Sequence, residues 1–149
     1  MSALTKRKDR QTMFPRLGEI QPLAAKAGTY YHGSFIGMPV VGGLVTHANE
    51  GGNAAKKYAG ICQEDIVIAS DGEPIDVLVN CPFWEENNAI AVTANAGKPI
   101  FANDDGDITL ATTNTPIGRI AAIRNGEAAT GNLDAVPGTV FIYPKAYSE

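Results

Sequence analysis

Alternating apolar and polar residues are concentrated in the stretch 94–123, where the pattern predicts a small β-sheet. Two β-rich runs, 99–102 and 107–111, flank the turn sequence Asn103-Asp104-Asp105-Gly106. Asp-Gly between such runs predicts a hairpin, because both residues accept the positive φ of a tight turn. A third run covers residues 117–123. We therefore predict a three-stranded meander, in which each strand pairs with the next, at the centre of the fold.

The third run also predicts which of its side chains share a face. Side chains along a strand point alternately to opposite sides of a sheet, so every second residue lies on the same side. One face is predicted to hold Ile117, Arg119, Ala121 and Ile123, and the other Gly118, Ile120 and Ala122.

Short β-rich runs separated by turn residues recur along the rest of the chain. Residues 53–58 have the composition of one helical turn capped by Asn53. Many short strands with turns between them are typical of an all-β protein, so we expect a small antiparallel β-sandwich or barrel. The further strands are predicted at 29–36, 37–44, 58–62, 65–69, 74–81, 89–93 and 139–143, with Ile75, Val77 and Val79 on one face.

The chain is expected to consist of an N-terminal arm, residues 1–27, and a β domain, residues 28–149. The first 13 residues show no hydrophobic period, and Pro15 and Pro22 discourage helix in the residues that follow, so the arm is predicted to be extended. A chain of 149 residues can bury a self-sufficient core. Its apolar runs are too short for a transmembrane span, and no secretory leader is expected.

Two pairs of segments resemble each other within the chain. Residues 37–41 (GMPVV) parallel residues 97–101 (GKPIF), and residues 58–61 (YAGI) parallel residues 116–119 (PIGR), at nearly equal separations. A diverged duplication would produce such a pattern, and so would chance similarity between Gly-rich β segments.

These glycine-containing segments also carry a resemblance to a known family. The chain contains the motifs G-x-x-x-G-x-P-V-V and Y-A-G-I, followed by G-x-P-[VI]-[FY], D-G-x-[IV]-T, a further threonine and I-G-x-[IV]. This pattern resembles the capsid cement or head decoration proteins of tailed bacteriophages. The similarity extends from about Gly28 to Tyr143.

The resemblance implies a non-enzymatic protein without a cofactor. Family members bind the outer capsid surface, often as trimers at local three-fold positions, and tie neighbouring major capsid protein subunits together after the shell expands. The expected partners are therefore the major capsid protein and other copies of the chain in a homotrimer, with no nucleic acid and no membrane. The expected location is the virion, after assembly in the host cytoplasm. Two alternatives remain: another virion β module, such as a tail or fibre base, and a small β-barrel enzyme or ligand-binding protein.

Charge is distributed unevenly along the chain. Residues 1–16 contain five cations and one acid, a net charge of +4. Since the whole chain has a net charge of −4, the remainder carries −8. A basic arm on an acidic body is expected to contact an acidic capsid surface, to bind nucleic acid or to remain a solvated tail. The acidic body opposes duplex binding. The predicted capsid-binding residues of the arm are Lys6, Arg7, Lys8, Arg10, Phe14, Arg16, Leu17 and Ile20.

Other candidate residues have both a functional and a structural interpretation. Phe83 and Trp84 are either an exposed anchor at an interface or part of the core. His32, His47, Cys62 and Cys81 are possible metal ligands, but none stands in a pair with ligand spacing, so no metal is expected. The two cysteines are expected to be buried free thiols, with a single disulfide as the other interpretation.

Three motifs resemble functional sites incompletely. Residues 103–107 resemble the start of a calcium loop, but Asn114 stands where the bidentate Glu is expected. Residues 126–131 have phosphate-loop spacing without the lysine, which favours an ordinary loop. Adjacent Glu85 and Glu86 would point to opposite faces of a strand, which is poor geometry for an acid/base pair.

Overall fold

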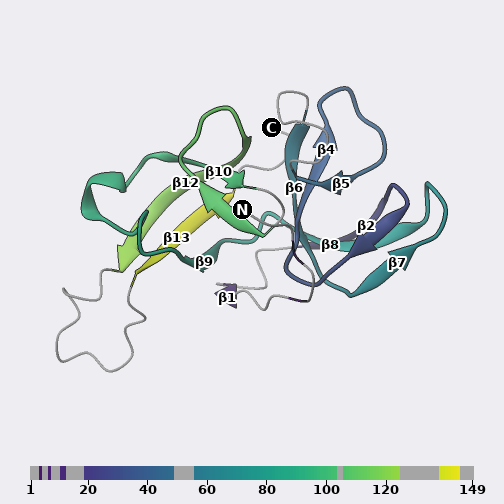
Figure 1. The fold of residues 1–149 in the computed structure, drawn as a ribbon, viewed down its shortest axis with the longest axis horizontal. Coiled ribbons are helices and arrows are strands. Elements are labelled where there is room, and N and C mark those ends of the chain that lie inside the picture. The colour runs from purple at the N-terminus through teal and green to yellow at the C-terminus, as the bar shows by residue number, and fades with distance from the viewer. Residues whose placement is uncertain are drawn as a thin grey trace.

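The fold is described from a computed structural model, for Leu4, Arg7 and residues 11–12, 19–48, 56–103, 106–124 and 138–144. In this part of the chain the regular structure is almost entirely antiparallel β-strand, which confirms the predicted all-β class (Figure 1). A short 3-10 helix, η2, covers Thr93–Asn95, and no helix among the described residues is long and apolar enough to cross a membrane. The strands are β1 (Gln11–Thr12), β2 (Glu19–Ala24), β3 (Gly28–Tyr30), β4 (Phe35–Pro39), β5 (Thr46–His47), β6 (Lys56–Cys62), β7 (Ile66–Ile68), β8 (Pro74–Val79), β9 (Phe83–Glu86), β10 (Pro99–Asn103), β11 (Asp107–Thr109), β12 (Thr115–Arg124) and β13 (Thr139–Pro144).

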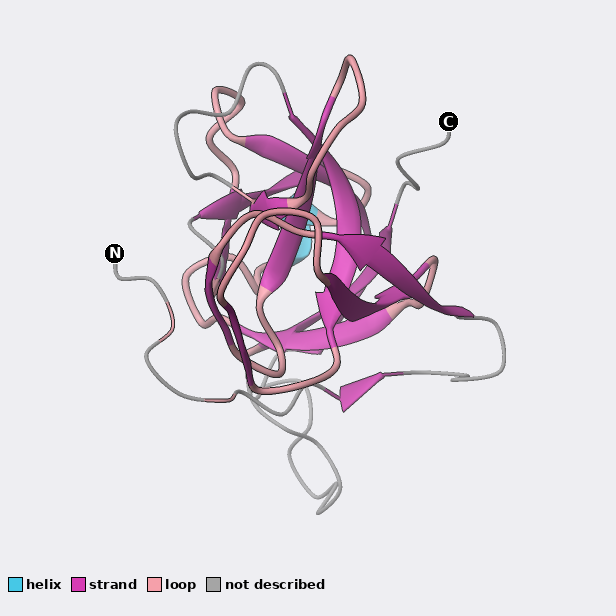
Figure 2. Ribbon diagram, turned by 90° about the vertical axis from the view of Figure 1, so that its right-hand side faces the viewer, coloured by secondary structure: helices cyan, strands magenta, loops and turns pink. Residues whose placement is uncertain are grey.

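The strands form three sheets. A six-stranded sheet has the order β1-β9-β13-β12-β10-β11, a five-stranded sheet has the order β2-β8-β6-β4-β5, and β3 and β7 form a two-stranded ribbon. Figure 2, viewed from the end that carries β7 and β8, shows the curved strands of different sheets crossing one another. The arrangement agrees with the predicted packing of antiparallel sheets.

The five-stranded sheet lies between two hydrophobic cores. Its side chains alternate between the two faces, as the pleat of a strand requires. The shared core separates it from the six-stranded sheet, and the buried Thr115 hydroxyl crosses this core to donate a hydrogen bond of 2.7 Å to the Ala48 carbonyl oxygen. The shared core contains Phe35, Tyr58 and Ile61 from the five-stranded sheet and Phe83, Ile100, Ile117, Ile120 and Ile142 from the six-stranded sheet.

The second core lies between the five-stranded sheet and the β3–β7 ribbon. Each large apolar side chain that it buries stabilises the fold by about 1.5–3 kcal/mol. Tyr30 and Ile68 of the ribbon are almost fully buried there. They pack with Ile36, Ala59, Cys62, Ile75, Val77 and Val79 of the five-stranded sheet. The expected common face of Ile75, Val77 and Val79 is thus confirmed.

The N-terminal segment contributes one strand to each large sheet. Glu19–Ala24, inside the predicted arm, pairs with β8 over six residues, and Gln11–Thr12 pairs with β9. The segment is extended, as expected, but its strands belong to the β body. The body therefore begins before residue 28.

The predicted meander of residues 99–123 is wrong in its strand order. The hairpin of β10 and β11 forms with Asn103 opposite Asp107, but β12 pairs with β10 rather than with β11. The central strand is thus the first of the three. The chain returns from the hairpin to the opposite edge of β10, and no local turn signal encodes that choice.

The predicted facing of residues 117–123 is also wrong. Ile100 pairs with Gly118 and Phe101 pairs with Pro116, which leaves Ile117 as the extra residue of a β-bulge. The bulge changes the alternation, so Ile117 and Ile120 are both buried in the shared core while Arg119 is exposed.

Two other predicted elements differ from the structure. The runs 29–36 and 37–44 are divided differently, because a turn with Gly33 at φ +95° separates β3 from β4, and the chain turns again after Pro39. The described part of the predicted helical turn 53–58, Lys56 to Tyr58, belongs to strand β6.

Residues 89–93 are not a strand. The strand of this region is β9, which lies between the predicted strands 74–81 and 89–93. After β9, the backbone N–H of Ile90 donates to the Asn87 side-chain oxygen at 3.1 Å, and the Ala91 N–H donates to the Asn87 carbonyl oxygen at 2.9 Å. These bonds close a turn that stops the strand.

The two halves of the chain have the same topology. The first unit consists of β2, β4, β5, β6 and β8, and the second unit of β9, β10, β11, β12 and β13. The sheet orders are β2-β8-β6-β4-β5 and β9-β13-β12-β10-β11. When the strands of each unit are counted along the chain, both orders read first, fifth, fourth, second, third. The β3–β7 ribbon is an addition to the first unit.

The register of the two units matches as well. In the first unit Ile36 pairs with Gly60, and Ala59 is the bulged residue because Gly37 pairs with Tyr58. In the second unit Ile100 pairs with Gly118, and Ile117 is bulged. The parallel between residues 58–61 and 116–119 is therefore structural. The parallel between 37–41 and 97–101 is not, since Pro39 ends β4 whereas Pro99 begins β10.

The units stack in the same direction instead of face to face. Phe35, Tyr58 and Ile61 of the first unit point into the shared core, but their register counterparts Pro99, Pro116 and Arg119 point away from it. We call the side of the six-stranded sheet that carries these counterparts the outward face. Conversely, Ile36, Cys62 and Val77 face the ribbon, whereas their counterparts Ile100, Ile120 and Ile142 face the shared core.

Candidate interaction site

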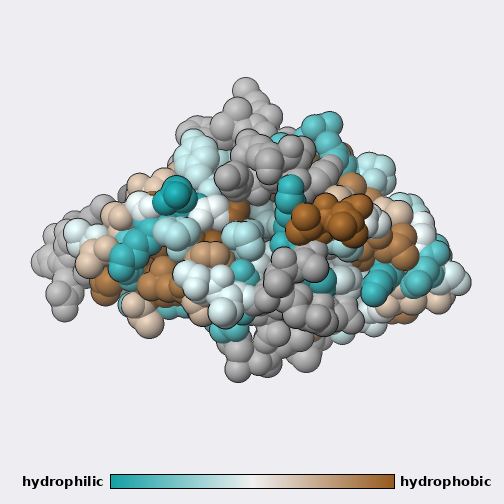
Figure 3. Space-filling model, turned by 90° about the horizontal axis from the view of Figure 1, so that it is seen from above, coloured by the Kyte–Doolittle hydropathy of each residue, from teal (hydrophilic) through white to brown (hydrophobic). Residues whose placement is uncertain are grey.

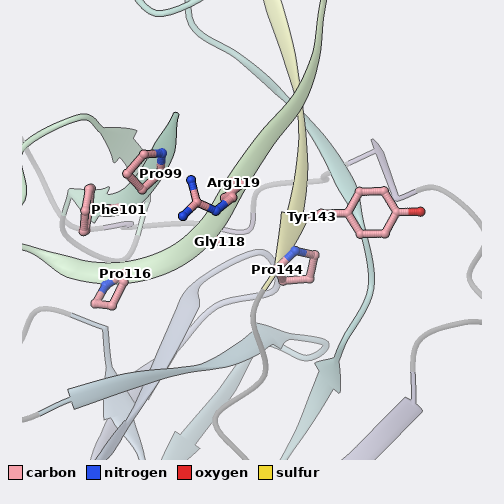
Figure 4. Close-up of a pocket in the computed structure, with 7 residues that line it drawn as sticks. All are labelled: Pro99, Phe101, Pro116, Gly118, Arg119, Tyr143 and Pro144. Atoms are coloured by element: carbon pink, nitrogen blue, oxygen red, sulfur yellow. The ribbon is translucent and has the colours of Figure 1, made fainter. Parts of the chain in front are cut away.

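A cavity of about 480 Å³ lies on the outward face, where β10, β12 and β13 run side by side (Figure 4). Cross-strand pairing places its residues together, because Pro99 pairs with Arg119, Arg119 pairs with Tyr143, and Phe101 pairs with Pro116. In the close-up, the Arg119 guanidinium group extends toward Pro99, and the Tyr143 ring points to the opposite side. The lining residues are Pro99, Phe101, Pro116, Gly118, Arg119, Tyr143 and Pro144.

A second cavity of about 480 Å³ adjoins the first at Phe101 and Pro116. We call the two together the groove. The second cavity extends the groove to the first unit and adds two cations to Arg119. None of the described residues that line the two cavities is a carboxylate. The lining residues of the second cavity are Val40, Lys56, Lys57, Phe101, Thr112, Thr113, Asn114 and Pro116.

Backbone carbonyl groups hold two of these cations in place. Arg119 Nη1 donates to the Gly97 carbonyl oxygen at 3.1 Å, and Lys56 Nζ donates to the His47 carbonyl oxygen at 3.2 Å. Each cation can donate more than a single hydrogen bond, because guanidinium has five N–H groups and ammonium three. The groove is thus an apolar channel with fixed positive charge, suited to an apolar partner surface bordered by carboxylates.

An aromatic row continues the outward face beyond the groove. The rings of Trp84 and Phe141 lie 4.8 Å apart, and those of Phe141 and Tyr143 lie 5.5 Å apart. The guanidinium carbon of Arg124 lies over the Trp84 ring, 4.3 Å from the ring centroid. The Trp84 Nε1–H is buried and has no acceptor among the described residues. Phe83, by contrast, is fully buried in the shared core, so the core interpretation holds for Phe83 and only Trp84 reaches the outward face.

Exposed apolar side chains cluster near one end of the groove. Val40 and Val41, at the turn after β4, are 53% and 95% exposed. Figure 3 shows a prominent group of apolar atoms on the half of the upper face that holds β4, and smaller groups elsewhere on this face. Exposed apolar atoms next to a groove are typical of a protein-binding surface.

Most of the predicted arm residues lie outside the described part of the chain. Arg7 is exposed, and Ile20 is 59% exposed on β2, at the edge of the five-stranded sheet. Lys6, Lys8, Arg10, Phe14, Arg16 and Leu17 are not among the described residues. The capsid-binding role of the arm stays a prediction.

The four candidate metal ligands do not come together as one group in the described part of the chain. The His47 ring stacks on Tyr30 with centroids 4.7 Å apart, and its Nε2 lies 3.0 Å from the Thr29 carbonyl oxygen. Cys62 and Cys81 are both buried free thiols, as expected. Among the described residues, no group of three or more His, Cys, Asp or Glu side chains could hold a metal ion.

Of the motifs that partially resemble functional sites, only the pair Glu85 and Glu86 lies wholly within the described residues. Glu85 is buried and Glu86 exposed, as expected for adjacent residues of one strand. The tip of the β10–β11 turn, residues 104–105, and the loop 126–131 lie outside the described residues.

Three acidic residues gather beyond the end of β6. Burial and the neighbouring Asp76 carboxylate, which also hydrogen-bonds to it, raise the pKa of Glu64. Burial raises the pKa of the Cys62 thiol to about 11, and the charges of Glu64, Asp65 and Asp76 add to this effect. This end of the molecule therefore carries a concentration of negative charge.

The groove was not found by sequence reasoning. Its residues come from β10, β12, β13, the start of β6, the turn after β4 and the turn before β12, so no single stretch contains it. The available signals were local: prolines beside strand aromatic residues in Pro99-Ile100-Phe101 and Tyr143-Pro144, and Arg119 within the otherwise apolar run 117–123.

Comparisons with protein-family models, with curated protein sequences and with solved protein structures found no match to this chain.

Proposed function

We propose that the protein is a non-enzymatic decoration protein that binds the outer surface of a mature bacteriophage capsid and stabilises contacts between major capsid protein subunits. The observation that carries the proposal is the outward face of the second unit. There a rigid sheet presents an apolar, cationic groove next to the exposed Val40 and Val41. The sequence resemblance to capsid decoration proteins supports the same conclusion.

The proposed mechanism is mass action. A protein that binds only the mature lattice stabilises that lattice by its free energy of binding. We propose that the protein acts as a homotrimer, so that several modest contacts add through effective concentration. Any arm residue that becomes ordered on docking costs about 1–2 kcal/mol of conformational entropy, so apolar contacts from Phe14, Leu17 and Ile20 must offset that cost.

The test is binding to two states of one capsid. The purified protein is mixed with expanded empty capsids and, separately, with procapsids built from the same major capsid protein. Bound protein is measured by co-sedimentation. We expect binding to expanded capsids only. Equal binding to both states, or to neither, contradicts the proposal. Averaged cryo-microscopy density on expanded particles tests the trimer, because isolated monomers at well-separated sites contradict it.

A matched pair of variants tests the surface. Val41→Ser removes a nearly fully exposed apolar side chain beside the groove, and Val92→Ser makes the same change at a position 41% exposed that lines neither cavity. Only Val41→Ser is expected to weaken capsid binding. Equal effects of the two variants contradict a role for this surface.

A further inference from the structure

The stacking of the two units leaves the two ends of the layered structure unlike each other. The first unit packs one face against the second unit, and the β3–β7 ribbon covers its other face. In the second unit, the face that corresponds to the ribbon-covered face of the first unit packs in the shared core. The remaining face of the second unit, which corresponds to the surface that Phe35, Tyr58 and Ile61 form in the first unit, carries the groove. The groove thus occupies the position at which a further layer would continue the stack.

The ribbon at the other end has the complementary chemistry. Val67 points outward from β7 and is 70% exposed, while its neighbours Ile66 and Ile68 turn toward the core. Four carboxylates border the ribbon in the sequence, whereas only one cation, the exposed Lys26, lies just before β3. The carboxylates are Glu64 and Asp65 before β7, and Asp71 and Glu73 after it.

The two surfaces cannot meet within one chain. Lys56 and Lys57 begin β6, and Glu64 lies beyond its end. A strand of seven residues is about 23 Å long at about 3.3 Å per residue. The ribbon covers the far face of the first unit, and the groove lies on the outward face of the second unit. The two sheets between them hold the apolar centre of the ribbon apart from that of the groove, so these two centres can meet only between copies.

We propose that the groove binds the β3–β7 ribbon of a second copy of this chain, so that copies associate head to tail. Val67 of one copy lies against Phe101 and Pro116 of the next, and the carboxylates beside the ribbon face Arg119, Lys56 and Lys57. The contact places the ribbon and the first unit of the next copy as further layers on the second unit. A head-to-tail contact forms a ring when its rotation closes, which is compatible with a homotrimer.

A groove-to-groove dimer is the competing arrangement. It would place the three cations of one groove against the same three cations of the other, and like charges in an interface oppose association. The ribbon removes this repulsion and offers carboxylates in its place. The inference rests on the proposed self-association but not on capsid binding, so the experiment uses the free protein alone.

The experiment is sedimentation velocity on the full chain and on two single variants, with folding of each checked by circular dichroism. Arg119→Glu replaces one of the three cations of the groove with a carboxylate, and Val67→Lys places a cation on the ribbon. Both side chains are exposed, so neither change disturbs a core. We expect the native chain to associate with rising concentration, and each variant to associate about a hundredfold more weakly. Val92→Lys, the same change away from both surfaces, is expected to associate like the native chain.

Mixing the variants distinguishes the two arrangements. An equimolar mixture pairs the intact groove of the Val67→Lys chain with the intact ribbon of the Arg119→Glu chain, so association is expected to return. Only a head-to-tail contact has this property. The fluorescence of Trp84, the single tryptophan, reports the same event, because its ring contacts Phe141, which contacts Tyr143 at the groove.

Three results would overturn the inference. The first is a native chain that stays monomeric at low salt up to about 1 mM, a concentration at which even weak contacts of about 4 kcal/mol are half formed. The second is unchanged association of either variant. The third is failure of the mixture to associate when the native chain does, which would indicate a groove-to-groove or unrelated contact. Capsid binding can succeed or fail independently of all three.

Discussion

Gly60 and Gly118 occupy the same position in the two halves of the chain. Each pairs with an isoleucine, Ile36 or Ile100, and each follows the bulged residue of its strand. Each also lies against the neighbouring strand so closely that an added Cβ would overlap a carbonyl oxygen, that of Leu78 or Tyr143. The two glycines therefore set the spacing between the fourth and fifth strands of each unit, β6 and β8 in the first and β12 and β13 in the second.

This spacing gives a direct stability test. Gly118→Ala is expected to destabilise the fold by about 3 kcal/mol or more, because the clash is with backbone and cannot be relieved by a side-chain rotation. Chemical denaturation measures the change. Ala121→Val adds more volume at an exposed position of the same strand and is expected to have an effect within about 0.5 kcal/mol. A similar loss in both variants would mean that the close approach does not limit β12.

The Cys62 thiol is expected to react slowly. Burial raises its pKa from 9.0 to about 11, so at pH 8 the thiolate fraction is about a hundredfold lower than in the unfolded chain. Labelling with a chromogenic disulfide should be slow in buffer and complete in denaturant, for Cys62 and for the buried Cys81 alike. Rapid labelling of the native protein would contradict the buried position.

The same shift predicts how stability depends on pH. The folded-state pKa of Cys62 is raised, so its contribution is fully present below about pH 9 and is lost as the pH rises toward 11. The melting temperature is expected to fall over this alkaline range. Cys62→Ala removes that part of the dependence, and an unchanged alkaline slope in this variant would assign the loss to other groups.

Glu64 is expected to reduce stability at neutral pH. Its pKa is raised from 4.5 by burial and by Asp76, so the stability it contributes in the protonated form is lost as the pH rises through its folded-state pKa. Glu64→Gln should raise the free energy of unfolding at pH 7 by less than about 1 kcal/mol, because the site is partly exposed, and should have no stabilising effect at pH 3. Glu86→Gln, an exposed control, should change neither. A loss of stability at pH 7 in Glu64→Gln would contradict the repulsion.

The arm must be truncated with β1 and β2 in mind. Deleting residues 1–22 would remove β1 and the first part of β2, so the informative deletion is residues 1–10. This variant is expected to keep the β fold by circular dichroism and to bind expanded capsids modestly more weakly, because it loses the arm's cations Lys6, Arg7, Lys8 and Arg10 but keeps its predicted apolar contact residues. Undiminished capsid binding would make this segment a solvated tail. Salt-sensitive DNA binding by the intact chain, lost on deletion, would favour the nucleic-acid interpretation.

Within the arm, charge and apolar contacts are expected to contribute unequally. Neutralising Lys6, Arg7, Lys8 and Arg10 should cost about 0–1 kcal/mol per exposed ion pair. Phe14→Ala or Leu17→Ala should cost more, since a buried side chain of this size is worth about 1.5–3 kcal/mol. Added salt should reduce only the charge contribution. Titration of each variant against expanded capsids measures both effects, and a larger cost from the charges would contradict a mainly apolar contact.

Local patterns predicted several elements well. The Asp-Gly turn identified the β10–β11 hairpin, and the β-rich runs at 58–62, 74–81 and 139–143 all became strands. These signals depend on a residue and its near neighbours: a turn needs particular backbone angles, and a strand favours β-branched side chains. The run 89–93 failed by the same logic, because hydrogen bonds to Asn87 fold it into a turn that its apolar composition does not reveal.

The amino-acid sequence was sufficient to predict the all-β class, the glycine positions that the two units share and the separation of a basic N-terminus from an acidic body. Long-range packing was needed to establish that β12 returns to β10, that Ile117 and Ile120 share one core, and that Arg119 joins Lys56 and Lys57 in one groove. The difference arises because hairpins and alternation are local properties of the backbone. Strand order, bulges and the choice of buried face depend on which distant surfaces exclude water together, and no single stretch of sequence contains that information.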